Sequence, residues 1–77
     1  MIKNIVDLKK IQILRKSRGI SRDKMANLLG LSSMYSYKNK ELGQRLFNVK
    51  DLYIISKFFH VSMEQLIIKD EEVKAND

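Results

Sequence analysis

The side chains of this chain that could do chemistry are few, and they favour binding over catalysis. His60 is the single histidine and there is no cysteine, which excludes disulfides, thiolate chemistry and a histidine metal cluster. The sequence has no serine–histidine–acid set, no catalytic carboxylate pair and no phosphate-binding glycine loop. What remains is a group of serines, an asparagine and many cations. We therefore expect neither an enzyme nor a cofactor.

The charge of the chain is strongly uneven along its length. Residues 70–77 have a net charge of −3, whereas residues 1–69 contain 14 of the 15 basic residues and five of the nine acidic ones, a net charge of +9. A basic domain attracts polyanions and speeds encounter with them in a salt-dependent way. The same charge also serves solubility, so by itself it does not identify a partner.

Residues 20–33 contain the signals for two helices joined by a sharp turn. Ser21 is a natural helix N-cap, and Met25, Ala26 and Leu29 follow as one apolar stripe. Gly30 favours the left-handed conformation that ends a helix. We expect Ser32 to cap the next helix, and the small side chain of Ala26 to let the two helices approach closely.

The rest of the chain has the pattern of a compact, all-α domain of five helices. Apolar spacing and caps predict helices over residues 7–18, 22–29, 33–40 and 49–59 and a fifth from residue 62. Asn48 can cap the fourth helix, whose stripe is Val49, Leu52, Ile55 and Phe59. Ser62 and Gln65 form a capping box for the fifth. His60 suits a left-handed helix end, and Lys16 and Arg18 complement the carboxyl end of the first helix.

This order of signals resembles the phage-repressor and Cro-type helix-turn-helix regulators over roughly residues 8–68. The pieces that match are the central turn 29–32 (Leu-Gly-Leu-Ser), residues 40–43 (Lys-Glu-Leu-Gly) and residues 60–62 (His-Val-Ser). The resemblance implies a lambda-repressor-like fold. It also implies sequence-specific binding of double-stranded DNA by a small transcriptional regulator, such as a repressor, with the third helix in the major groove.

The family resemblance also implies which residues contact DNA. The base-reading residues it implies are Ser32, Ser33, Met34, Tyr35, Ser36, Lys38 and Asn39. The phosphate contacts it implies are Ser21, Arg22, Lys40, Gln44 and Arg45. At Arg22 the family usually has glutamine, and an arginine retains the phosphate contact.

Residues 32–43 are one residue longer than the family spacing, and one residue rotates a helix by about 100°. Counting forward from Ser32 buries Ser36 and Asn39, whereas counting back from Gly43 buries Tyr37 and the stem of Lys40. We favour the second register because it buries the more apolar pair. The extra residue then lies among residues 33–36, within the reading face.

The inserted residue leaves a second hypothesis open, in which the same fold is a protein-binding module of antirepressor or antitoxin type. Met34, Tyr35 and Leu46, with Tyr37 and Phe47, would form its apolar patch. We expect Tyr37 and Phe47 to belong to the core instead, since aromatic residues at helical spacing usually do. Tyr35 is open to base contact or to partner contact.

A domain of this size covers half of a DNA site, so the resemblance implies a homodimer on sites about 34 Å apart. Val61, Met63, Ile67 and Ile68 are the candidate dimer interface, although they could also close the end of the core. The domain is expected over residues 1–69, with residues 70–77 as a frayed acidic tail. No apolar run approaches the ~20 residues of a membrane span, and lysines interrupt the amino terminus, so we expect a cytoplasmic protein without a membrane partner.

Overall fold

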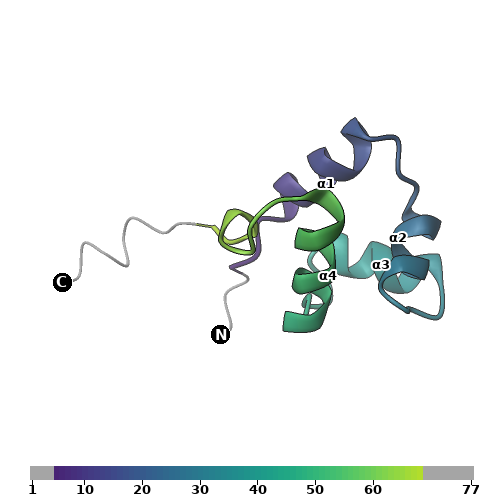
Figure 1. Cartoon of the computed structure of the whole chain (residues 1–77). Coiled ribbons are helices and arrows are strands. Elements are labelled where there is room, and N and C mark those ends of the chain that lie inside the picture. Colours follow the sequence, from purple (N-terminus) through teal and green to yellow (C-terminus); the bar gives the residue numbers. More distant parts are fainter. Residues whose placement is uncertain (1–4, 69–77) are drawn as a thin grey trace.

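The computed structural model describes residues 5–68, and within them the chain forms four α-helices and one short 3-10 turn (Figure 1). The helices are α1 (Leu8–Ser17), α2 (Arg22–Leu28), α3 (Met34–Glu41) and α4 (Val49–Phe59). The small all-α architecture is therefore confirmed, but the fifth helix is not. The acidic residues 70–77 lie outside the described residues.

Each helix begins at a polar side chain that accepts from a free backbone amide of its first turn. The hydroxyl of Ser21 accepts from the amide of Lys24 at 3.1 Å, and Asn48 and Asp51 form a reciprocal capping box at the start of α4. α3 is capped by Ser33, not by Ser32 as the sequence suggested. Because α2 also ends at Leu28 and not at Leu29, the segment between α2 and α3 is residues 29–33, two residues longer than the expected 30–32.

All four helices contribute buried apolar residues to the core. The expected residues Met25, Ala26 and Leu29 are all buried. In α4 the expected stripe holds for Leu52, Ile55 and Phe59, but Val49 is 74% exposed. Val49 is the first residue of α4, and its position next to the cap turns it away from the neighbouring helices.

The register of α3 is the one counted back from Gly43. Tyr37 is fully buried, the Lys40 residue is 9% exposed, and Ser36 and Asn39 are only partly covered. The ring of Tyr37 packs edge-on against Phe47 with centroids 6.1 Å apart. Tyr37 and Phe47 thus belong to the core, as expected, and are withdrawn from the apolar patch considered for a protein-binding module.

The end of the domain is a single 3-10 turn, Glu64–Leu66, in place of the expected fifth helix. The capping box is present, because the amide of Ser62 donates to Gln65 Oε1 at 2.9 Å and the amide of Gln65 donates to Ser62 Oγ at 3.1 Å. After this turn the chain extends and pairs antiparallel with the segment before α1 through a bridge between Val6 and Ile67. Helical hydrogen bonds are thus exchanged for bonds to residues 5–7.

The arrangement of the elements leaves one side of α3 uncovered. α2 and α3 make the most extensive contact among the helices and lie together at the end of the molecule away from the 3-10 turn (Figure 1). The 3-10 turn contacts α1 at the opposite end. The predicted reading helix and the predicted dimer residues therefore lie at different ends of the fold.

Candidate nucleic-acid interface

The exposed edge of α3 begins with two serines that bind each other. Ser33 Oγ accepts from the amide of Ser36 at 3.3 Å, and the two hydroxyl oxygens are also 3.3 Å apart. Ser32 is exposed just before them. Of the predicted base-reading serines, Ser33 and Ser36 are thus partly engaged in starting the helix.

The largest exposed side chain on this edge is Tyr35, which is 64% exposed. The ammonium of Lys38 lies over its ring, 5.9 Å from the centroid, within the range of a cation–π contact. Asn39 is half-buried, and its backbone carbonyl accepts from the backbone amides of Gln44 and Arg45 at 2.8 and 3.2 Å. Tyr35, with the ammonium of half-buried Lys38 over its ring, is therefore the largest exposed group of the predicted reading set.

An open hollow lies beside this edge, where α1, α2 and α3 meet. Its volume is about 410 Å³, and it is lined by Arg15, Lys16, Ser21, Arg22, Asp23, Met34 and Lys38. The hollow brings together two predicted phosphate contacts, Ser21 and Arg22, and two predicted base readers, Met34 and Lys38. Of the four cations around it, Arg15 and Arg22 also bind the buried carboxylate of Glu41, and Asp23 adds a second carboxylate. The net charge that remains is positive, so the hollow suits an anion.

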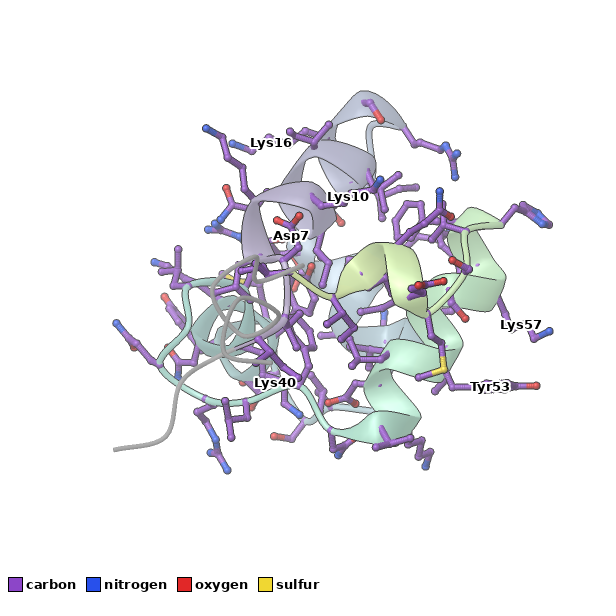
Figure 2. The ribbon with its side chains drawn as sticks, turned by 90° about the vertical axis from the view of Figure 1, so that its left-hand side faces the viewer. Asp7, Lys10, Lys16, Lys40, Tyr53 and Lys57 are labelled. Atoms are coloured by element: carbon purple, nitrogen blue, oxygen red, sulfur yellow. The ribbon has the colours of Figure 1, made fainter. Side chains whose placement is uncertain are left out.

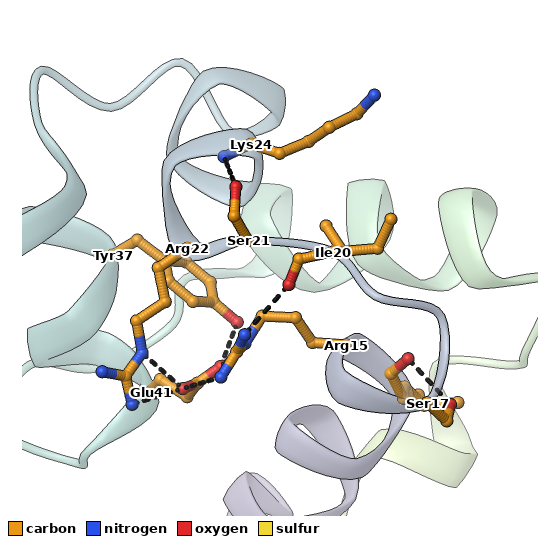
Figure 3. Close-up of polar contacts among 9 residues, drawn as sticks. Arg15, Ser17, Ile20, Ser21, Arg22, Lys24, Tyr37 and Glu41 are labelled. Carbon is orange, nitrogen blue, oxygen red and sulfur yellow. Dashed lines mark hydrogen bonds and ion pairs between the residues drawn. The ribbon is translucent and has the colours of Figure 1, made fainter.

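The position of Arg22 in the hollow is set by a buried carboxylate. Glu41 is fully buried and accepts from Arg22 Nε at 3.0 Å, while Arg15 Nε and the hydroxyl of Tyr37 each donate to it at 2.7 Å. Arg15 also donates to the carbonyl of Ile20 at 2.9 Å. Figure 3 shows these groups converging on Glu41 from three helices.

The ionisation of this cluster follows from its hydrogen bonds. Burial alone would raise the pKa of the Glu41 carboxyl, but the hydrogen bonds from Arg15, Tyr37 and Arg22 together outweigh burial and lower that pKa. Burial and the hydrogen bond to Glu41 raise the pKa of Tyr37. Glu41 is therefore a carboxylate and Tyr37 a neutral donor at neutral pH. The side chain of Arg22, which lines the hollow, is 29% exposed.

Lys40 is the predicted phosphate contact that the structure places elsewhere. Its ammonium forms a buried ion pair with Asp51, which joins the end of α3 to the start of α4. The Lys40 side chain is 11% exposed. Since the charge is compensated inside the protein, we leave Lys40 out of the proposed DNA contacts. Gln44 and Arg45 are exposed after α3, away from the residues that line the hollow.

Four residues of the site are not predicted as site residues from the sequence: Arg15, Lys16, Asp23 and Glu41. The sequence favours Lys16 as a charge that complements the carboxyl end of the first helix, yet Lys16 is exposed and lines the hollow. Glu41 belongs to the Lys-Glu-Leu-Gly segment that resembles the family, but the resemblance implies no DNA contact for it. The spacing of Tyr37 and Glu41, four residues apart on one helix, was the available signal for a side-chain pair.

The four candidate dimer residues differ in exposure. Val61, Met63 and Ile67 are half-buried and pack against the core. Ile68 is 48% exposed, and its amide donates to the carbonyl of Ile5 at 2.7 Å. Val61, Met63 and Ile67 therefore mainly close the end of the core. Ile68 is the candidate that remains for a dimer interface.

No helix among residues 5–68 combines the length and the apolar character needed to cross a membrane. Comparisons with protein-family models, with curated proteins and with solved structures found no match to this chain. What the chain binds is therefore inferred from its own residues and their geometry.

Proposed function

We propose that this chain binds double-stranded DNA as a small transcriptional regulator of the phage-repressor and Cro type. In this proposal α3 enters the major groove, and the hollow between α1, α2 and α3 receives the phosphate backbone. The observation that carries the proposal is the adjacency of an exposed polar edge with a cationic hollow. Tyr35 and Lys38 lie on the edge, and Lys38 also lines the hollow together with Arg22.

The chemistry of the two parts suits the two halves of DNA recognition. Cations and exposed hydroxyls around the hollow match phosphate oxygens, which set affinity and orientation. Side chains on the edge of α3 are of types that pair with base edges in the major groove. Gln44 and Arg45, exposed after the end of α3, add phosphate contacts in this proposal.

The test is selection from a pool of random duplexes at two salt concentrations, with the recovered sequence then titrated across a salt series. We expect one sequence to be enriched, and the logarithm of its binding constant to fall linearly with the logarithm of salt concentration. Enrichment at neither salt concentration would refute the proposal.

The second candidate is a protein-binding module. Three exposed apolar side chains favour it, since Tyr35 is 64%, Leu46 is 53% and Leu42 is 46% exposed around the end and the edge of α3. This candidate requires tight binding of a partner protein with no enrichment of any duplex. It is the weaker of the two because Tyr37 and Phe47 are buried and no longer extend the patch.

A further inference from the structure

We infer that Tyr35 and Lys38 act as one unit that reads a pyrimidine 5-methyl group together with the guanine of the neighbouring base pair. This inference rests on the proposed DNA binding and names the chemistry that the site selects. It concerns thymine and also 5-methylcytosine, because both present a methyl group at the same position of the major groove.

The other candidate side chains on the edge are short or half-buried. Ser33 and Ser36 hydrogen-bond to each other, and Ser33 caps the helix. Met34 is half-buried and faces the hollow, and Asn39 is half-buried beside the loop that follows α3. Tyr35 is 64% exposed. Lys38 is half-buried like Met34 and Asn39, but its long side chain carries the ammonium over the exposed Tyr35 ring.

Tyr35 and Lys38 lie close together on α3. They are three residues apart, so their side chains lie on one face. The ammonium lies 5.9 Å from the ring centroid. Successive base pairs are about 3.4 Å apart along the duplex. The edge of the Tyr35 ring can contact one base pair while the Lys38 ammonium, on the same face of α3, contacts the next base pair.

The Tyr35 ring and the Lys38 ammonium suit a methyl group and a guanine in their chemistry. Within residues 5–68 the Tyr35 hydroxyl makes no hydrogen bond, and the ring is 64% exposed, so its apolar surface gains from covering a methyl group. An ammonium over the ring leaves its other donors available for the O6 and N7 acceptors of guanine. The cation–π contact also restrains the ring before DNA arrives, which reduces the entropy lost on binding.

The experiment uses the duplex recovered by selection, in which each thymine in turn is replaced by uracil and each guanine by 7-deazaguanine. We expect one thymine at which uracil weakens wild-type binding about fourfold, the effect of one buried methyl group. At the neighbouring base pair, 7-deazaguanine should weaken binding about fivefold or more. Replacing the sensitive thymine by 5-methylcytosine, paired with guanine, should retain the methyl contribution relative to cytosine.

The variants assign these effects to the pair. Tyr35→Ala should bind the thymine and uracil duplexes equally, whereas Tyr35→Phe, which keeps the ring, should retain the difference. Lys38→Met should lose the guanine effect and weaken the methyl effect. The matched control is the Tyr53–Lys57 pair on α4, whose ammonium lies 5.5 Å from the ring centroid. Figure 2 shows both of these side chains projecting outward from the body of the protein. Tyr53→Ala should change neither effect.

Each outcome decides the inference. Wild-type protein that binds the selected duplex but does not distinguish thymine from uracil at any position overturns the inference and leaves the proposed function standing. A methyl effect that persists in Tyr35→Ala overturns it in the same way. If selection enriches no duplex, the proposed function fails and the inference fails with it.

Discussion

At the scale of single residues, the most consequential side chain is Glu41, because one buried carboxylate joins α1, α2 and α3. Glu41→Gln keeps the shape but removes the charge that compensates Arg15 and Arg22. Since breaking a buried ion pair leaves an uncompensated charge, we expect the free energy of unfolding to fall by about 3 kcal/mol. Urea denaturation followed by circular dichroism measures this change.

The matched control is Glu64→Gln in the 3-10 turn. Glu64 is exposed and forms no ion pair within the described residues, so its substitution should change the free energy of unfolding by less than about 0.5 kcal/mol. Equal effects of the two substitutions would show that the Glu41 cluster does not stabilise the fold.

The lowered pKa of Glu41 also predicts a dependence on pH. In the unfolded chain a glutamate has a pKa of about 4.3, and the folded value is lower. The ionised carboxylate therefore stabilises the folded state at neutral pH, and this contribution is lost as the pH falls below about 4.3 and through the folded pKa. The difference in unfolding free energy between wild type and Glu41→Gln should shrink in acid. A difference that is constant with pH would contradict this assignment.

What the sequence could and could not predict at this scale follows from the distance between partners along the chain. Burial of Tyr37 and of the Lys40 stem was predictable, because it follows from helical spacing alone. The ion pairs of Lys40 with Asp51 and of Arg15 with Glu41 were not, because the partners are 11 and 26 residues apart and meet only through packing. Lys40 was for this reason assigned to phosphate.

At the scale of elements, helix ends carry most of the local information. His60 ends α4 with φ of 59°, and Gly30 follows α2 with φ of 71°. A side chain in this left-handed region costs roughly 1 kcal/mol relative to glycine. His60→Gly should therefore raise the free energy of unfolding by about 1 kcal/mol, and Gly30→Ala should lower it by a similar amount, in urea denaturation.

The open space around Gly30 identifies the cause of the expected loss of stability. A Cβ atom at Gly30 meets nothing within 4 Å, so the expected loss in Gly30→Ala comes from the backbone conformation and not from a clash. A destabilised His60→Gly variant would contradict the account. It would indicate that the imidazole itself makes a stabilising contact.

The missing fifth helix shows where local signals stop being sufficient. The capping box of Ser62 and Gln65 forms as the sequence predicts, yet it starts only one 3-10 turn. Further turns would compete with backbone hydrogen bonds to residues 5–7, including the 2.8 Å bond from the amide of Asp7 to the carbonyl of Leu66. Those partners lie about sixty residues away along the chain, beyond the reach of a pattern in the local sequence.

At the scale of the whole molecule, dimerisation is a prediction that concerns the end of the fold opposite α3. Ile68 is half-exposed, so Ile68→Asp should dissociate a dimer without unfolding the monomer. Sedimentation velocity measures the dissociation, and circular dichroism checks the fold. If Ile68→Asp instead lowers stability at unchanged mass, Ile68 closes the core and the dimer must form elsewhere.

Binding of DNA by α3 and the adjacent hollow can be tested by reversing one charge at a time. Lys38→Glu alters the proposed site, and Lys57→Glu makes the same change in net charge on α4, outside it. Affinity for the selected duplex at fixed salt should fall about tenfold or more for Lys38→Glu, and much less for Lys57→Glu. Equal losses for the two variants would contradict the account, because binding would then depend on total charge and not on this surface.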